Sequence, residues 1–360
     1  IASTNPEAAV GGGGGETVEE VRMNTMAHFA AQNNNVAKAI FTRAKKMARQ
    51  TAIVDLSGKK YNYLKMISIS YYLKMLLKPT IKHQQNIGIL LPPSAAGAFT
   101  NISVLAMGKT VVNLNYTAGK TNLLHAVDTA NLKTLITSKI FINKLSKKQF
   151  NLTPLLEKCD VIYLEDHISE QSKRKIAPLM ILLGLLPRSS GQWLFCKSTR
   201  DNQTAAIVFS SGSEGSPKGV ELTHSNLLSN IHQVITIFNI RNDDVILSSL
   251  PLFHSFGFCT TTLMPLIVGA PMICQPDPTD ASAIGTAAYQ YNVTLMCGTS
   301  TLFNLYVRNK KCVAESFSSL RIIIAGAEKL QATVTDAFAK KFNKVIYEGY
   351  GTSIRSRGVN

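Results

Sequence analysis

Residues 209–220 read FSSGSEGSPKGV and follow the apolar run Ala205 to Val208. A Gly/Ser loop at the end of a strand exposes backbone N–H groups and hydroxyls that can surround phosphate oxygens, and Lys218 adds a positive charge. The run is not a P-loop of the G-x-x-x-x-G-K-[ST] type, because Pro217 stands at the second glycine position and Gly219 at the Ser/Thr position. The sequence therefore predicts a nucleotide-phosphate loop of another class, between a strand and a helix.

Short apolar runs bounded by Gly, Pro or Asn alternate with helical patterns along the chain. The predicted strands are residues 85–91, 110–114, 134–137, 161–164, 205–210, 270–274, 295–297, 320–325 and 345–347. After Thr223, a suitable N-cap, apolar residues recur on one helical face from Leu227 to Phe238. This alternation predicts an α/β protein of layered parallel βαβ units.

The run from Ser210 to Gly219 resembles the [ST]-S-G-[ST]-[TE]-G-x-P-K-G loop of the acyl-adenylate-forming superfamily, which contains acyl-CoA synthetases, peptide-synthetase adenylation domains and luciferases. Three further motifs follow in the family's order. PLFHSFG at 251–257 resembles the family's segment beside the acyl pocket. AGAEKL at 325–330 resembles the loop that lies along the adenine, and EGYGT at 348–352 resembles the segment whose tyrosine stacks on the base. The resemblance covers about residues 24 to 353 and implies the large N-terminal domain of the adenylate-forming, acyl-CoA synthetase-like fold.

The particular motif variants, together with GTST at 298–301, resemble more narrowly the acyl-[acyl-carrier-protein] synthetase half of bifunctional 2-acylglycerophosphoethanolamine acyltransferases. That resemblance implies a two-step reaction. A fatty acid and ATP form acyl-AMP, and the phosphopantetheine thiol of acyl carrier protein then takes the acyl group for lysophospholipid reacylation. Two alternatives stay open: a long-chain fatty acyl-CoA ligase, and a nucleotide-binding remnant without chemistry.

Adenylation of an amino or aryl acid would require a polar acid-binding pocket. Against it, the sequence offers apolar lining candidates in and near the motifs, namely Leu252, Phe253, Phe256, Phe258, Leu302 and Phe303. These favour a fatty acid as the substrate.

The resemblance assigns catalytic roles to Lys218, at the phosphates, and to His254, near the acyl carboxylate or at the mouth of its pocket. The residues that it implies for ATP binding are Ser210, Ser211, Gly212, Ser213, Glu214, Gly215, Lys218, Gly219, Gly326, Ala327, Glu328, Tyr350, Gly351, Thr352 and Ser353. Mg²⁺ is implied with ATP, but Ile354 stands at the family's metal-binding glutamate and carries no oxygen ligand. No metal-ligating residue is therefore assigned.

The predicted domain organisation has two parts. Residues 1–23 contain five consecutive glycines and are expected to be a linker or the tail of a preceding acyltransferase domain. Residues 24–360 are expected to be a partial AMP-binding domain, incomplete at its C-terminus, with subdomains at about 24–200 and 201–360. Because the family's hinge, C-terminal domain and adenylation lysine have no counterpart here, we expect this chain to bind ATP weakly and to form no acyl-AMP alone.

The chain carries 38 Lys and Arg against 22 Asp and Glu, a formal charge of +16. Such an excess favours acidic partners such as acyl carrier protein or anionic lipid headgroups. No RNA-binding, zinc or helix-turn-helix motif accompanies the charge, so nucleic acid is not a predicted partner. The six cysteines form no C-x-x-C pair, which favours a reduced, cytoplasmic protein with buried thiols.

Residues 176–186 are apolar, contain Pro178 and follow the basic triplet Lys173 to Lys175. Eleven residues are too few to span a bilayer. Such a segment can form a buried helix or a link between subdomains, or it can lie in a membrane interface at the cytoplasmic face of the inner membrane.

Overall fold

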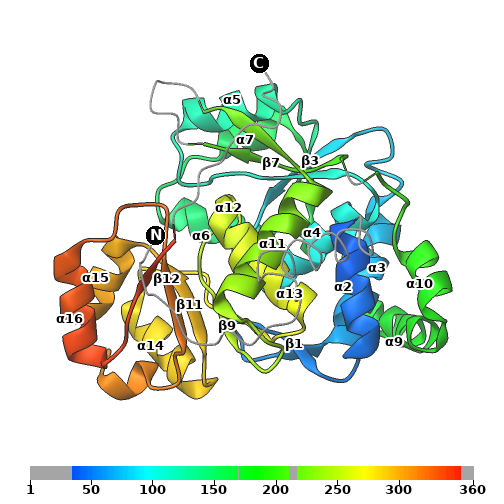
Figure 1. Ribbon diagram of the computed structural model, residues 1–360. Helices are drawn as coiled ribbons and strands as arrows, with labels where there is room; N and C mark the ends of the chain where they lie inside the picture. Colours follow the sequence, from blue (N-terminus) through cyan, green and yellow to red (C-terminus); the bar gives the residue numbers. More distant parts are fainter. Residues whose placement is uncertain (1–34, 169, 201, 211–216, 350–360) are drawn as a thin grey trace, which may run out of the picture.

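The computed structural model describes residues 35–168, 170–200, 202–210 and 217–349 (Figure 1). Its strands form two sheets. Sheet A has the order β13-β12-β11-β9-β10-β1-β2, and sheet B has the order β6-β5-β3-β4-β7-β8. Neighbouring strands are parallel except for the antiparallel pairs β1·β2 and β7·β8. The predicted α/β fold with parallel layers is therefore confirmed.

All nine predicted strands occur, within a few residues of their expected ends. The strands of sheet A are β1 (Thr51–Val54), β2 (Lys60–Asn62), β9 (Ile246–Ser248), β10 (Met272–Cys274), β11 (Leu295–Gly298), β12 (Ile322–Ala325) and β13 (Tyr347–Glu348). Those of sheet B are β3 (Asn86–Leu90), β4 (Thr110–Asn113), β5 (Thr134–Thr137), β6 (Asp160–Tyr163), β7 (Thr204–Phe209) and β8 (Gly219–Thr223). Sequence patterns missed β1, β2, β8 and β9, which are short or lie directly beside a turn or loop.

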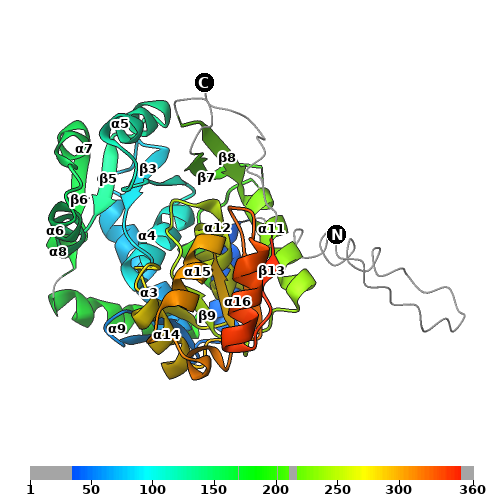
Figure 2. The ribbon, with the colours of Figure 1, turned by 90° about the vertical axis from the view of Figure 1, so that its left-hand side faces the viewer.

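Helices cover both faces of each sheet (Figures 1 and 2). They are α2 (Val36–Lys46), α3 (Tyr63–Leu77), α4 (Ala95–Ala106), α5 (Lys120–Thr129), α6 (Lys139–Lys147), α7 (Thr153–Lys158), α8 (Leu164–His167), α9 (Glu170–Leu185), α10 (Arg188–Phe195), α11 (His224–Phe238), α12 (Ser255–Phe258), α13 (Met264–Val268), α14 (Ala281–Gln290), α15 (Ser300–Arg308) and α16 (Ala332–Phe342). A π-helical turn, Cys259–Leu263, joins α12 to α13, and Ala314–Phe317 is a 3₁₀ helix.

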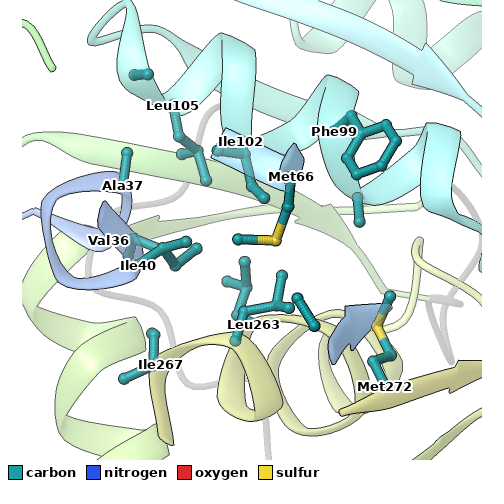
Figure 3. Packing of buried hydrophobic residues seen from close by; sticks show 14 of the residues in the cluster. Val36, Ala37, Ile40, Met66, Phe99, Ile102, Leu105, Leu263, Ile267 and Met272 are labelled. Atoms are coloured by element: carbon teal, nitrogen blue, oxygen red, sulfur yellow. The ribbon is translucent and has the colours of Figure 1, made fainter. Parts of the chain in front are cut away.

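Three hydrophobic cores follow from the alternation of side chains along the strands. In β11, Leu295 and Cys297 belong to the central core between the two sheets, whereas Met296 belongs to the core under α14–α16. A third core lies between sheet B and α5–α7. The central core is filled by α2, α3, α4 and the α12–α13 region, and Figure 3 shows Met66 of α3 among Ile102 of α4 and Leu263. The two sheets therefore share one helical layer.

The two sheets do not divide the chain at residue 200. Strands β1 and β2 precede this point but pair within sheet A, and β7 and β8 follow it but pair within sheet B. Because each sheet draws strands from both segments, the proposed subdomains at 24–200 and 201–360 do not coincide with the sheets. The predicted linker, residues 1–23, lies outside the described residues.

All six cysteines are free and buried, as the sequence predicts. Burial raises the pKa of each thiol, for Cys259 to about 12. At neutral pH these side chains are therefore protonated and act as small apolar groups.

Helix α11 begins where the sequence predicts, with Thr223 and Asn226 forming a reciprocal capping box. His224, the first residue of the helix, is fully buried, and its Nδ1 accepts a hydrogen bond of 3.3 Å from the backbone N–H of Val36. Burial lowers the pKa of His224 to about 4. The ring is therefore neutral in the folded protein and joins α11 to the start of α2.

We expect His224 to make folding sensitive to acid. An unfolded histidine takes up a proton below its ordinary pKa of 6.5, whereas the folded ring resists protonation down to about 4. Stability from this residue is complete above pH 6.5 and is lost as pH falls toward 4, by about 3 kcal/mol in total. Urea unfolding across this range should show the loss in the wild type. His224→Asn, whose side-chain oxygen can replace Nδ1, should lack this part of the pH dependence, and exposed His83→Asn should keep it. Equal pH profiles for the wild type and His224→Asn would contradict the assignment.

Candidate nucleotide and acyl site

The family-like motifs lie at the carboxyl ends of strands. In sheet A, β9 lies between β10 and β11. The connection from β9 leads to β10 on one side, and the connection from its neighbour β11 leads to β12 on the other side, so the two connections run in opposite directions. Ligands of open α/β sheets bind at such a switch point, outside the carboxyl ends of the strands. PLFHSFG follows β9, AGAEKL begins in the last residue of β12, and EGYGT begins in the last residue of β13. The structure thus brings three of the four motifs to one edge of sheet A.

Hydrogen bonds join the loops at this edge. Glu328 accepts bonds from the backbone N–H and the hydroxyl of Thr301, the latter at 3.2 Å. Leu330 N–H donates to Glu348 Oε1 at 2.9 Å, and Gly349 N–H donates to the carbonyl of Ala325 at 2.7 Å. The loops after β11, β12 and β13 therefore form one connected rim.

The carboxylate of Glu328 accepts its hydrogen bonds within this rim. Although burial raises its pKa, the hydrogen bonds from Thr301 outweigh that effect and lower the pKa below its ordinary value. Glu328 is therefore ionised at neutral pH and orients the loop that carries Gly326. Its contact with ATP stays a prediction, whereas Thr301, which holds it, was not among the predicted binding residues.

The predicted adenine slot is formed by Gly326 and Ala327. A methyl group on Gly326 would lie 3.0 Å from Cε1 of Phe256, so that ring packs directly over the glycine. Ala327 has a φ of 68°, a left-handed conformation that is uncommon for residues with a Cβ. This local geometry links the AGAEKL loop to the PLFHSFG loop through Phe256. Tyr350, Gly351, Thr352 and Ser353 lie outside the described residues.

The phosphate-loop motif connects two strands rather than a strand and a helix. Strand β7 pairs with β8 in antiparallel fashion, with Phe209 opposite Gly219, and Ser210 N–H donates to the carbonyl of Lys218 at 3.0 Å. The predicted strand–loop–helix order is therefore wrong, because GVELT after the loop extends the sheet before α11 begins. The inner residues Ser211, Gly212, Ser213, Glu214 and Gly215 lie outside the described residues.

The described ends of the phosphate loop are held in place. The Nε2 atom of His125 in α5 lies 3.1 Å from the carbonyl oxygen of Pro217. Because a carbonyl oxygen can only accept a hydrogen bond, Nε2 is the donor. Next to it, the side chain of Lys218 is exposed. An exposed ammonium beside an anchored backbone is suited to meet a phosphate that enters from solvent.

The carboxyl edges of the two sheets meet at the loop after β9. The ring of Phe253 contacts Tyr116, which follows β4 of sheet B, edge to face with centroids 5.0 Å apart. Leu252 packs against Gly97 of α4, where an added methyl group would lie 2.9 Å from its Cδ1. Tyr116 was not a predicted site residue, although an aromatic side chain just after a predicted strand was a usable signal.

His254 lies at the start of α12, with its ring 4.6 Å from that of Phe253. The side chain is exposed, but partial desolvation among its neighbours lowers its pKa below the ordinary value. The imidazole is therefore neutral at pH 7. In this state it can donate or accept a hydrogen bond near a carboxylate without adding charge, and a catalytic role stays a prediction.

Four of the six apolar lining candidates are buried, and Leu252 and Phe253 are among them at 1% and 4% exposure. Phe303 is fully buried beside Phe338 in the core under α14–α16, and Phe258 is buried in the central core. The sequence could not distinguish them from pocket residues, because both kinds of position are apolar. Phe256 and Leu302 are only partly buried and remain candidates for contact with a ligand.

No group of three or more His, Cys, Asp or Glu side chains in the described part of the chain could hold a metal ion. Ile354 and its neighbours lie outside that part. A cavity of about 410 Å³ lies at the carboxyl ends of β1 and β10, between Asp55 and Gln275, and no motif residue lines it.

Comparisons with known proteins agree with this arrangement. The family model described as AMP-binding enzyme matches residues 40–353. A long-chain-fatty-acid–CoA ligase of Salmonella typhimurium is 29% identical over 150 residues, which cover 41% of this chain and 27% of the ligase. 4-Coumarate–CoA ligase 4 of Arabidopsis thaliana is 25% identical over 276 residues, covering 75% of this chain and 47% of the ligase. These alignments span between about a quarter and half of each relative's length.

Among solved structures, ATP-bound MatB from Rhodopseudomonas palustris matches with a TM-score of 0.68 and 19% identity, over 89% of this chain and 60% of MatB. A benzoate CoA ligase from Burkholderia xenovorans matches with the same TM-score and identity, over 89% of this chain and 61% of that one. At this identity the matches establish the fold.

Proposed function

The chain belongs to the AMP-binding enzyme family, and from this premise we propose that it binds ATP and a fatty acid as part of a ligase that forms acyl-AMP and passes the acyl group to a thiol. The observation that carries the proposal is the convergence of the motif loops at the carboxyl edge of sheet A. The rim of sheet A and the loop after β4 of sheet B meet at the contact of Phe253 with Tyr116.

In the first step, a carboxylate oxygen of the fatty acid forms a bond to the α-phosphorus of ATP, and the bond from that phosphorus to the pyrophosphate oxygen breaks. Negative charge develops on the leaving pyrophosphate, and preorganised positive groups stabilise such charge most effectively. Lys218 and the N–H groups of its hairpin would supply them. In the second step, a thiolate attacks the acyl carbon and AMP leaves.

A fatty acid fits the described residues better than an amino acid. The side chains that join the two sheets at this edge, Leu252, Phe253 and Tyr116, are apolar or aromatic. Burial raises the pKa of Tyr116 to about 12, so its phenol is uncharged. An amino-acid substrate would need a buried charged partner for its ammonium group. The similarity to long-chain-fatty-acid–CoA ligases supports the same choice.

Acyl carrier protein is the proposed acyl acceptor, with lysophospholipid reacylation as the purpose. The formal charge of +16 supports it, because acyl carrier proteins are strongly acidic and opposite charge accelerates encounter. The similarity to CoA ligases favours CoA as the second candidate acceptor.

A stable acyl-AMP analogue tests the proposed substrates without requiring turnover. We expect palmitoyl-sulfamoyl-adenosine to raise the melting temperature of the 360-residue chain and to bind at least about 10-fold more tightly than AMP, because burial of an alkyl chain adds favourable free energy. Calorimetric titration measures both affinities, with the benzoyl and glycyl analogues as matched controls. Tighter binding of the benzoyl analogue would indicate an aryl acid as the substrate instead of a fatty acid. Equal affinities for all three analogues and AMP would support nucleotide binding only, without an acyl substrate.

A further inference from the structure

Large apolar side chains are exposed where α9 joins α10. Leu185 and Trp193 are 81% and 83% exposed, and Ile181 is 64% exposed. Only Leu186 and Pro187 separate the two helices. Ile181 and Leu185 are four residues apart and therefore lie on one helical face. We refer to residues 174–193 as the α9–α10 corner; exposed apolar groups concentrated in this way commonly mark an interaction site.

The α9–α10 corner is firmly packed against the rest of the protein. Lys45 of α2 donates to the carbonyls of Leu183 and Gly184 at 2.8 and 2.7 Å. Lys74 of α3 binds the carbonyls of Leu194 and Phe195 at 3.0 and 2.6 Å. These lysines satisfy the ends of both helices. The exposed side chains therefore lie on helices that are fixed to the rest of the protein, and other side chains of these helices, such as Leu183, are part of the core.

The surroundings of the α9–α10 corner are basic. From the start of α9 to residue 200, the sequence includes one acidic residue, Glu170, and six basic residues, namely Lys173, Arg174, Lys175, Arg188, Lys197 and Arg200. The sequences of α2 and α3, which hold the corner, contain no Asp or Glu. Figure 1 shows α9 and α10 at the periphery, on the opposite side of the molecule from α14–α16. The corner thus combines positive charge with apolar bulk at an accessible edge.

We propose that the α9–α10 corner docks on an anionic lipid bilayer, with Ile181, Leu185 and Trp193 in the interface and the basic residues at the headgroups. Tryptophan prefers this interface because its ring is apolar and its indole N–H is polar. Basic residues gain free energy near anionic headgroups. An acidic protein would match the charge but gains less from the exposed Trp, Leu and Ile side chains, so the bilayer is favoured. No helix in the described ranges is long and apolar enough to cross a membrane.

This docking goes beyond the proposed ligase activity and does not depend on it. Its effect on the enzyme would be to place the protein at a surface in which fatty acids dissolve.

Trp193 is the chain's single tryptophan, so its fluorescence reports directly on the corner. We expect mixed phosphatidylglycerol–phosphatidylcholine vesicles to shift the emission to shorter wavelength and to protect the ring from acrylamide. Brominated acyl chains should quench it. Pure phosphatidylcholine vesicles should produce a weaker change, since each basic residue near an anionic surface contributes about fivefold in affinity.

Variants separate the apolar contribution to vesicle binding from the electrostatic contribution, and co-sedimentation with vesicles measures both. Leu185→Ser should weaken binding about 10-fold or more, because it removes a leucine side chain that the bilayer would bury. Arg174→Gln with Lys175→Gln should weaken it roughly 25-fold by the same charge effect. Ile237→Ser on α11, also exposed, and Lys310→Gln with Lys311→Gln are the matched controls and should bind as the wild type does.

Unchanged Trp193 emission with anionic vesicles would overturn the proposal. So would a shift caused by acyl carrier protein but not by vesicles, which would identify the corner as a protein interface. Equal losses in the corner variants and the controls would show that binding depends on total charge or fold rather than on this surface.

Discussion

Lys218→Ala is expected to slow acyl-adenylate formation about 100-fold or more, in a chimera that joins this chain to the C-terminal domain of a long-chain-fatty-acid–CoA ligase. Lys218 is exposed at the end of the β7–β8 hairpin, where its ammonium can meet the phosphates of ATP. Removing one preorganised positive group from a site of developing negative charge costs roughly 2 to 4 kcal/mol of transition-state stabilisation. Fatty-acid-dependent exchange of pyrophosphate into ATP measures this step directly.

Two variants sharpen the test of Lys218. Lys218→Arg keeps the positive charge and should retain more activity than Lys218→Ala, whereas Lys310→Ala removes an exposed lysine far along the chain and should leave exchange unchanged. The carbonyl of Lys218, which closes the hairpin, is present in every variant, so the melting temperature should stay constant. Exchange by Lys218→Ala at the wild-type rate would remove this lysine from the mechanism.

Arg321→Ala is expected to lower the free energy of unfolding by about 3 kcal/mol. Arg321 donates to both carboxylate oxygens of Asp244, through Nη2 at 2.5 Å and Nε at 3.3 Å, and Asp244 is only 2% exposed. Thr294 adds a third bond to that carboxylate at 2.7 Å. Removing one partner leaves a buried charge without its counterion, which costs about 3 to 5 kcal/mol. We expect the lower end, because the arginine side chain is partly exposed.

A double-mutant cycle isolates this ion pair. Adding Asp244→Asn to Arg321→Ala removes the stranded charge and should recover part of the lost stability in urea unfolding. The pair Arg241 and Asp243 lies nearby on the surface, and Arg241→Ala should cost about 1 kcal/mol or less. If Arg321→Ala and Arg241→Ala cost the same, the buried pair does not stabilise the fold.

The ion pair also shows why sequence patterns revealed only part of the structure. Asp244 precedes β9 and Arg321 precedes β12, and both lie at the amino edge of sheet A, opposite the site. Strand β12 was predicted from its apolar run, whereas β9 (Ile246–Ser248) was not predicted. The central position of β9, and hence the switch point beside it, required the complete strand order.

The sequence named candidate site residues but not the contacts that bring their loops together. Ser210, Lys218 and Gly326 were identified from motifs, and the structure places each at the end of a strand. The packing of Phe256 on Gly326 and the contact of Phe253 with Tyr116 were not foreseen. Neither contact follows from local periodicity, because each joins loops from separate parts of the chain.

The sequence by itself determined the α/β class, nine of the strands, helix α11 with its cap, and the family to which the phosphate loop belongs. These features depend on residues close together in the chain, whose apolar spacing and turn chemistry act locally. Only the tertiary structure decided that both sheets take strands from both sides of residue 200, that Phe303 fills a core and that Trp193 faces solvent. An apolar residue has the same local pattern in a core, a pocket or an exposed corner, and packing between distant segments alone distinguishes them.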